Sequence, residues 1–397
     1  MTDFLAEAQA LFAYTQSLRR DFHMHPELGF NEVRTSGIVA KELTKLGLEV
    51  HTGVAKTGVV ALLEGAMPGP VILARFDMDA LPILEETGAE YASQNAGVMH
   101  ACGHDGHTAI GLTVAKILRA HRQELAGTVK FIFQPAEEGM GGAEGMIDAG
   151  ILENPKPDLS LALHVWNEKP LGWFGLASGP VMAGAELFKI KVRGKGGHGA
   201  VPHLTADPVL AAAEIVSALQ SIVSRNVAPL KSAVLSVCTI HGGEAFNVIP
   251  QTVELAGTIR TFEPEVREKV LERFEIIVYG LAETMGCQAE VELQRLTPAT
   301  INQPESAARL ASLARQMFPT ADVDTSDYIT MGSEDFAFIM VKVPGCYFLV
   351  GSANKEKGLD ASHHHPRFDF DEQALSHGAA LMASAIAELA ETLSIKE

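Results

Sequence analysis

Residues 100–107 read HACGHDGH and hold more potential metal ligands than ordinary packing requires. Three histidines, one cysteine and one aspartate fall within these eight residues. Neutral imidazole and thiolate are the usual donors to zinc and similar ions, and Gly103 and Gly106 permit the tight turn that lets several donors converge. The stretch therefore predicts the anchor of a metal site. Considered alone, it is also compatible with a histidine-rich helix start of purely structural role.

Other acidic residues and a further histidine each follow an apolar run of the kind that forms a buried strand. Asp77 and Asp79 follow VILAR, Glu137 and Glu138 follow TVKFIFQPA, and His164 follows LSLAL. In parallel sheets, functional groups gather just past the carboxyl ends of the strands. We therefore expect these side chains to converge on one edge of a sheet, where the loop that carries Cys102 and His104 also reaches.

This combination predicts a site for two divalent metal ions. Ligands from Cys102, His104, Glu138, His164 and one of the late histidines would suffice for two ions. Two neighbouring ions lower the pKa of a bridging water, polarise a carbonyl and stabilise the oxyanion that develops. One carboxylate of the pair at 137–138 then ligates, while the other takes a proton from the water and passes it to a leaving nitrogen. Taken alone, the pair would instead indicate a solvated helix start.

The elements that must position these residues alternate between strands and helices. Strands with little polar alternation predict an α/β fold whose mostly parallel sheet is covered on both faces. Before residue 184, the pattern predicts helices over 3–22 and 104–121, a glycine-rich turn with a short helix over 139–149, and strands over 59–63, 71–76, 128–134 and 159–163. After residue 297, it predicts a helix over 305–317, a strand over 346–350 and a final helix from Asp371. His23 and His25, at the end of the first helix, are interpreted as structural.

A different pattern begins at residue 184. Apolar and basic residues alternate over 186–193, which is typical of a sheet with one solvent-facing side. Asp207 and Pro208 then mark the start of a helix over 208–224. Two strands (233–240 and 252–261), a helix (264–285) and a strand (289–293) complete a β-α-β-β-α-β order, which is ferredoxin-like. We expect a catalytic domain over 1–183 and 297–397 and an inserted α+β domain over 184–296.

Composition excludes several classes of partner. A formal net charge of −18 opposes binding to a nucleic-acid backbone, and no apolar run is long enough to span a membrane. The start of the chain lacks the pattern of a secretion signal, so a cytoplasmic location is expected. The four cysteines show no disulfide spacing, and one ligand with three core residues is the simplest interpretation.

Several ordered motifs carry a family resemblance that runs from about residue 15 to 385. They are RFDMDALP (75–82), MHACGHDGH (99–107), FQPAEEG (133–139), GKGGHGAVPH (194–203), FNVIP (246–250), GTIRTF (257–262), MGSEDF (331–336) and HHHPRFDFDE (363–372). Together they resemble the aminoacylase and carboxypeptidase superfamily of metallohydrolases. Within it, they are most similar to the amidohydrolase branch of hippurate hydrolases, N-acyl-amino-acid hydrolases and auxin-conjugate hydrolases. Many motifs in order are far more specific than any single one.

The resemblance implies a role for each matching residue. The implied metal ligands are Cys102, His104, Glu138, His164 and His364, with His363 and His365 as alternatives if the register of the triple histidine differs. Glu137 matches the general base, Asp79 the aspartate that orients a ligand, and His198 a histidine that stabilises the reacting carbonyl from a neighbouring subunit. Asn247 and Arg260 resemble residues that hold a substrate carboxylate, and Gly332 and Ser333 match positions that line the acyl pocket. Asp77 stands where more distant members have a ligand histidine.

The resemblance also implies the reaction and the partners. We expect hydrolysis of N-acyl amino acids by metal-activated water, with two divalent ions that are zinc or manganese, or alternatively cobalt or nickel. The inserted domain would mediate dimerisation, and the protein is expected to be a homodimer or a homotetramer. A dipeptidase or carboxypeptidase is the alternative within the superfamily. A non-catalytic binding protein or a structural zinc protein is less consistent with a complete, carboxylate-rich set of ligands.

Overall fold

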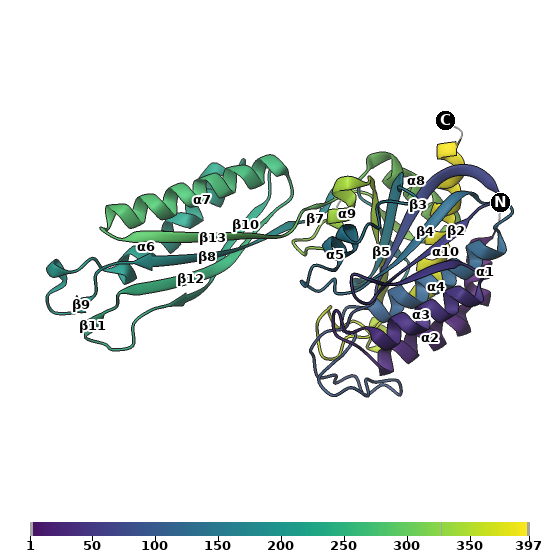
Figure 1. The fold of residues 1–397 in the computed structure, drawn as a ribbon, viewed down its shortest axis with the longest axis horizontal. Helices are drawn as coiled ribbons and strands as arrows, with labels where there is room; N and C mark the ends of the chain where they lie inside the picture. Colours follow the sequence, from purple (N-terminus) through teal and green to yellow (C-terminus); the bar gives the residue numbers. More distant parts are fainter. Residues whose placement is uncertain (1–2, 327, 395–397) are drawn as a thin grey trace. The chain divides into compact units, whose positions relative to one another are not determined.

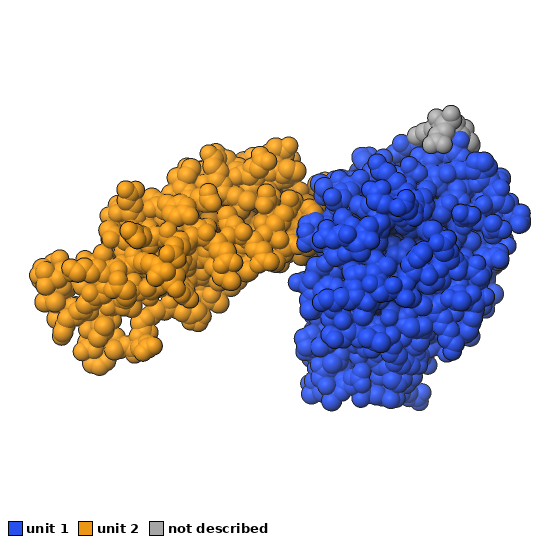
Figure 2. Space-filling view, viewed as in Figure 1, with its two compact units in different colours: residues 1–179, 301–329, 335–397 blue, residues 180–300, 330–334 orange. Residues whose placement is uncertain are grey.

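The computed structural model describes residues 3–326 and 328–394, which form two compact units (Figure 2). Unit 1 comprises Met1–Gly179, Ile301–Ile329 and Asp335–Glu397, and unit 2 comprises Pro180–Thr300 and Thr330–Glu334. Unit 2 thus extends four residues further at each end than the insert expected at 184–296, and it also takes in 330–334. No helix in the described ranges combines the length and apolar character that crossing a membrane requires.

An eight-stranded sheet organises unit 1, with strand order β1-β2-β4-β3-β5-β16-β6-β15. Figure 1 labels four of its strands, β2, β3, β4 and β5. The strands are β1 (Glu49–Val54), β2 (Gly58–Glu64), β3 (Met67–Asp77), β4 (Ala126–Gln134), β5 (Leu159–Pro170), β6 (Trp173–Gly175), β15 (Asp322–Asp324) and β16 (Gly345–Ala353). The four central strands β4, β3, β5 and β16 run parallel. Successive residues of β4 and β16 are buried, so both faces of the sheet are covered. The predicted α/β fold with a mostly parallel sheet is confirmed.

Eight helices are seen in the described part of unit 1. They are α1 (Phe4–Ala10), α2 (Phe12–Met24), α3 (Val33–Lys45), α4 (His104–Ala120), α5 (Gly142–Asp148), α8 (Pro304–Met317), α9 (Ala337–Lys342) and α10 (Gln373–Ser394). Helices α4 and α10 pack directly against the sheet and against each other, and they are buried along most of their length. The single helix predicted over 3–22 is wrong, because the backbone leaves the helical conformation at Leu11 (φ −90°, ψ 2°).

Unit 2 is a four-stranded antiparallel sheet covered by two helices on one face. Its order is β10-β12-β8-β13, which is the strand order of a ferredoxin-like β-α-β-β-α-β unit. The elements are β8 (Gly184–Arg193), α6 (Pro208–Ser221), β10 (Ala233–His241), β12 (Thr252–Thr261), α7 (Pro264–Thr284) and β13 (Gln288–Thr297). Phe188, Ile190 and Val192 point into the core with α6 and α7, as their alternation predicts. Asp207 caps α6 by accepting hydrogen bonds from the backbone of Val209 and Leu210.

Short elements complete the chain. A two-stranded ribbon of β9 (Gly197–His198) and β11 (Val248–Ile249) extends from the sheet of unit 2 (Figure 1). A π-helical turn over Ile222–Asn226 follows α6, and 3-10 turns cover Pro202–Leu204 and Lys355–Lys357. Strands β7 (Gly179–Met182) and β14 (Thr300–Asn302) lie where the chain passes from one unit to the other.

Candidate metal centre

The ends of three neighbouring strands carry the candidate ligands. Asp77 is the last residue of β3, and Glu137 and Glu138 follow the end of β4. His164 does not follow its strand as predicted, because β5 continues to Pro170. The ladder between β3 and β5 ends where Arg75 pairs with Ala162, so His164 lies level with the end of β3. Because β5 extends beyond the last residue pair it forms with β3, His164 lies at the same sheet edge as the carboxylates.

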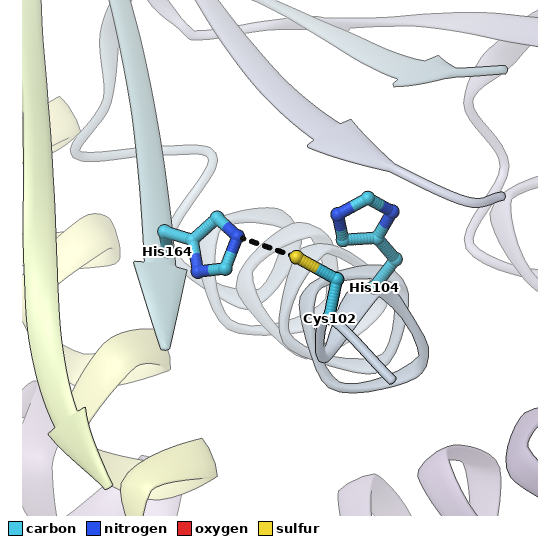
Figure 3. Close-up of side chains that lie close together, drawn as sticks. All are labelled: Cys102, His104 and His164. Carbon is cyan, nitrogen blue, oxygen red and sulfur yellow. Dashed lines mark hydrogen bonds between the residues drawn. The ribbon is translucent and has the colours of Figure 1, made fainter. Parts of the chain in front are cut away.

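A first donor group consists of Cys102, His104 and His164 (Figure 3). One ligand atom from each lies within 4.8 Å of the others, and Cys102 Sγ is 3.4 Å from His164 Nε2. The turn into α4 needs Gly103, which has φ +93° and lies so close to Val165 that a Cβ would be 2.4 Å from that side chain. The backbone at Gly103 thus lets Cys102 and the first residue of α4 face the same point.

A second donor group consists of Cys102, Glu138 and His364, again with ligand atoms within 4.8 Å of one another. His364 Nε2 lies 3.1 Å from Glu138 Oε1, and the His364 backbone N–H donates to the carbonyl of Ala101 at 2.8 Å. His364 adopts φ +64°, an unfavourable conformation for a non-glycine residue that is frequent at functional sites.

The neighbours of His364 have other partners. His363 Nε2 accepts a hydrogen bond from the backbone N–H of Asn167, although its Nδ1 lies 3.9 Å from Cys102 Sγ. His365 is exposed, and its Nδ1 accepts from the backbone N–H of Arg367. The geometry therefore favours the register in which His364 is the ligand.

Asp79 and Glu137 lie beside these groups. Asp79 Oδ1 is 3.2 Å from His104 Nδ1, and Asp79 Oδ2 accepts a hydrogen bond from the Glu138 backbone at 3.0 Å. One buried carboxylate thus holds two candidate ligands in place, which is the usual function of groups that surround metal ligands. Donor atoms of His104, Glu137 and Glu138 all lie within 4.8 Å of one another. Glu137 is therefore placed next to the donors without belonging to either group described above.

The charges of the centre favour bound cations. Burial raises the pKa of the Cys102 thiol well above its usual value, and Glu138 and Glu137 raise it further. Burial lowers the pKa of His104, but Asp77 and Asp79 outweigh burial and raise that pKa to about 10. His104 Nε2 is nevertheless buried with no hydrogen-bond partner among the described residues. A divalent cation would supply both the missing partner and the positive charge, so these residues fit a metal centre.

Behind the centre lies a buried ion-pair network that sequence analysis missed. Arg75 donates from Nη1 to Asp77 Oδ2 and from Nη2 to Asp335 Oδ1, at 2.5 and 3.1 Å. Burial opposes ionisation of Asp77, but His104, Arg75 and His107 outweigh burial and hold the pKa of this carboxyl well below its usual range. Asp77 thus balances the charge of Arg75. The only sequence signals are the charged residues Arg75 and Asp77 at the end of an apolar strand and Asp335 in MGSEDF.

A second missed network joins α2 to the segments that carry two ligands. Arg19 is fully buried and donates to Asp105, next to His104, and to Asp369, five residues after His364, at 2.8 Å each. His23 Nδ1 lies 2.7 Å from Asp105 Oδ2, in accord with a structural role for this histidine.

We expect Arg19→Met to lower the free energy of unfolding of unit 1 by about 3–5 kcal/mol, because it leaves buried carboxylates without a counter-charge. Arg20→Met is the matched control. Arg20 pairs with Glu372, but its side chain is 37% exposed, so the expected loss is below about 1 kcal/mol. Urea denaturation of both variants measures the difference. Equal stability losses would show that the Arg19 network does not hold these segments together.

The remaining candidate residues lie in unit 2 and do not form one cluster. His198 and Asn247 are exposed on the ribbon of β9 and β11, where the Gly199 N–H donates to the Asn247 carbonyl. Arg260 pairs with Ala185 near the opposite end of the sheet. The eight residue-to-residue steps from Ala185 to Arg193, the end of β8, span roughly 26 Å. Gly332 and Ser333 follow Thr330, and the Gly332 carbonyl accepts from the Ala183 backbone at 2.9 Å.

The fold and the site together describe an α/β protein with a candidate metal centre at the carboxyl edge of its parallel sheet. Residues 73–388 match the sequence profile of Peptidase family M20/M25/M40, and the chain belongs to this family. The predicted family resemblance is therefore confirmed. Membership makes the protein a hydrolase of amide bonds.

Relatives of known name cover most of the chain. IAA-amino acid hydrolase ILR1-like 4 of Arabidopsis thaliana is 40% identical over 388 residues, which cover 96% of this chain and 86% of that protein. N-acetylcysteine deacetylase of Bacillus subtilis (strain 168) is 39% identical over 385 residues, which cover 95% and 97%. Among solved structures, Bacillus subtilis YXEP, described as a dinuclear metal binding peptidase from the M20 family, matches with a TM-score of 0.85 at 35% identity. That match covers 97% of this chain and 99% of YXEP.

Proposed function

We propose that this protein hydrolyses the amide bond of N-acyl amino acids to a carboxylic acid and a free amino acid. The observation that carries the proposal is the pair Glu137 and Glu138, whose donor atoms lie with His104 within 4.8 Å. Glu138, Cys102, His104, His164 and His364 would hold two divalent ions, zinc or manganese, or alternatively cobalt or nickel. Those ions would supply Lewis acidity to the amide carbonyl and lower the pKa of a water at the site.

The chain's own residues then divide the remaining work. Glu137 is the general base that takes the proton from the attacking water and returns it to the leaving nitrogen. Asp79 fixes His104 and the Glu138 backbone, so the ligands keep their geometry while the proton moves. Relatives named as hydrolases of an amino acid conjugate and of N-acetylcysteine support a substrate with an acylated amino group.

Arg260 has the properties of a receptor for the substrate carboxylate. Its Nη1 is buried without a hydrogen-bond partner among residues 3–326 and 328–394, and burial lowers the pKa of the guanidinium. A buried guanidinium nitrogen without a partner is costly, and a carboxylate can satisfy this half-buried arginine in two-pronged geometry. Gly332 and Ser333 are proposed to line the acyl pocket.

We expect Arg260→Lys to raise KM for N-acyl amino acids by roughly 10- to 100-fold, because lysine cannot form the two-pronged pair. The corresponding N-acyl amino acid amides, which lack the carboxylate, should show no such change. Arg193→Lys, at an exposed arginine of the same sheet that pairs with Glu290, serves as the matched control. An Arg260→Lys enzyme with unchanged KM for both substrate series would remove Arg260 from the binding site.

Two copies of the chain are proposed to share their active sites. Arg260 and the pair His198 and Asn247 are separated by most of the sheet of unit 2, so one copy cannot apply all three residues to one substrate. The ribbon also exposes apolar side chains, with Phe246 fully exposed and Val248 52% exposed. Exposed apolar surface of this kind is typical of an interaction site. We therefore propose that His198 stabilises the oxyanion in the active site of the partner copy of a homodimer, or of a homotetramer of dimers.

Mixing two inactive variants tests this sharing. Glu137→Gln and His198→Ala protein should each have little activity. After the subunits of the two variants are exchanged, about one quarter of wild-type activity should return, because each mixed dimer then contains one intact site. Mixing either variant with itself gives the control. Absence of recovery after demonstrated subunit exchange would place His198 and Glu137 in the same copy.

A panel of substrates tests the proposed function directly. Release of free amino acid would be measured from N-acetyl and N-benzoyl amino acids and from unblocked dipeptides, with metal-loaded protein and with a chelated control. The proposal predicts metal-dependent release from the blocked substrates. Release from dipeptides alone would contradict it and identify a dipeptidase.

The four free cysteines are compatible with the reducing, cytoplasmic location that we propose for the reaction.

A further inference from the structure

Two histidines hold the backbone of Val165, one at its carbonyl and one at its N–H. Its carbonyl accepts a hydrogen bond from His164 Nδ1 at 2.5 Å, and its N–H donates to His107 Nε2 at 2.9 Å. Because Nδ1 of His164 donates to this carbonyl, Nε2 of the same ring carries the free lone pair. That nitrogen faces Cys102 Sγ at 3.4 Å, in the first donor group.

His107 is in turn held by a carboxylate. Its Nδ1 lies 2.6 Å from Asp77 Oδ1, and both side chains are fully buried. Because Nε2 accepts from Val165, the proton of the neutral ring is on Nδ1 and points to Asp77. Asp77 itself is fixed through its second oxygen by Arg75. The His107 ring also packs edge to face against His164, with 4.5 Å between the ring centroids.

We propose that Asp77 and His107 are positioning residues for the metal ligand His164, which they hold through the backbone of Val165. The inference rests on the metal centre of the proposed function. The Val165 N–H belongs to the peptide that links His164 to Val165, so its hydrogen bond to His107 fixes the backbone from which the His164 ring and the Val165 carbonyl both extend. The hydrogen bond from His164 Nδ1–H to that carbonyl fixes the ring orientation and makes Nε2 a more basic ligand, as carboxylate–histidine pairs do at zinc sites. Here the backbone of Val165 stands between the two histidines.

This arrangement also excludes a different interpretation of the same residues. Ligand atoms of Asp77, His104 and His107 lie within 4.8 Å of one another and could in principle bind a further ion. Both nitrogens of His107 are already engaged, one as donor to Asp77 and one as acceptor from Val165. The neutral ring therefore has no lone pair left for a metal.

Two amide substitutions at His107 separate positioning from packing. His107→Gln places an amide oxygen near the position of Nε2, so it still accepts from the Val165 N–H. His107→Asn places its amide near Nδ1, so it reaches Asp77 but leaves the Val165 N–H without an acceptor. Lys130→Met is the control in the same sheet, because Lys130 is buried and donates to the carbonyls of residues 151, 153 and 155, away from the ligands.

Metal affinity, measured by competition with a chromophoric chelator, is the main readout, and the visible absorption of cobalt-loaded protein is the second. We expect His107→Asn to weaken the binding of one ion by roughly 10- to 100-fold and to change the cobalt spectrum. His107→Gln should retain most of the metal affinity. Lys130→Met should reduce thermal stability but leave the metal affinity unchanged. Equal affinity losses in the two His107 variants, or wild-type affinity in both, would overturn the proposal.

The outcomes also separate this inference from the proposed function. Wild-type protein that binds two ions but hydrolyses no N-acyl amino acid would refute the function, and the affinities of the His107 variants would still decide the positioning role. An active wild-type enzyme with unchanged affinity in His107→Asn would refute positioning alone. Wild-type protein that binds no ion would refute both.

Discussion

Glu137→Gln is expected to lower kcat for N-acyl amino acid hydrolysis by roughly 10²- to 10⁴-fold, the contribution usual for a positioned general base. The amide keeps the size and hydrogen-bonding capacity of the side chain but cannot take a proton from water. Because Glu137 lies beside both Glu138 and His104 without belonging to either donor group that contains Cys102, two ions should still bind. Activity would be measured together with bound metal, so that loss of base and loss of metal are distinguished.

Glu144→Gln is the matched control for this substitution. Glu144 is an exposed carboxylate in the first turn of α5, seven residues further along the chain. We expect wild-type kcat from this variant. A Glu137→Gln enzyme that keeps more than half of its activity would show that another group accepts the proton. A variant that loses its metal as well as its activity would instead assign Glu137 to the ligands.

Cys102→Ala is expected to have the second large effect, because Cys102 belongs to both donor groups. Its removal should leave fewer than two ions bound per chain. The rate of hydrolysis should fall by more than roughly 100-fold, which is the upper end of the loss expected when a residue that only supports a ligand is removed. Cys238→Ala, at an exposed cysteine in unit 2, should retain full activity and full metal content. Metal analysis after dialysis and initial-rate kinetics measure both quantities.

Chemical modification provides an independent check on Cys102. Alkylation of this thiol should abolish activity, because the thiolate is the proposed ligand. Burial and the neighbouring carboxylates raise the thiol pKa, so the metal-free native protein should react slowly at Cys102 and faster at exposed Cys238. Full activity after modification of Cys102, established by mass spectrometry, would remove the residue from the site.

Several elements with a strong hydrophobic period could be predicted from the sequence, whereas an exposed edge strand could not. The predicted strand over 252–261 has the bounds of β12, and the alternation over 186–193 predicted which side chains of β8 are buried. Helix α3 and strand β1 were missed. In the structure, β1 is an edge strand with four of its six residues exposed, and only Thr35, Val39 and Leu43 are buried in α3. Strand β1 therefore has no clear apolar pattern, whereas the four-residue spacing of Thr35, Val39 and Leu43 in α3 is a helical period that the sequence analysis overlooked.

The strand containing His164 shows a different limit. The apolar run LSLAL suggests a strand that ends before the histidine, but β5 continues to Pro170. It does so because its far end pairs with β16, where Ala353 lies opposite Pro170. The length of a strand thus depends on a partner nearly 200 residues away, which local sequence does not reveal.

The candidate ligands could be proposed from sequence because each lies in a short motif with its own chemistry. Asp79 could be proposed in the same way, but the buried ion-pair networks behind the ligands could not, because their partners come from distant segments. Arg75 and Asp335 are 260 residues apart, and Arg19 and Asp369 are 350 residues apart. The sequence around a single arginine or aspartate does not reveal a partner at such a distance along the chain. His107 lay within the recognised motif, but its role depends on the backbone of Val165, which only the fold brings beside it.

Stepwise reactivation of metal-free protein tests the central claim most directly. Protein freed of metal by chelation would be titrated with manganese or zinc, and bound ions and hydrolysis of the best N-acyl amino acid would be measured at each step. We predict no hydrolysis without metal and a rise that reaches its maximum at two bound ions per chain. Full activity in metal-free protein, or no hydrolysis of any N-acyl amino acid with two ions bound, would contradict metal-dependent amide hydrolysis at this site.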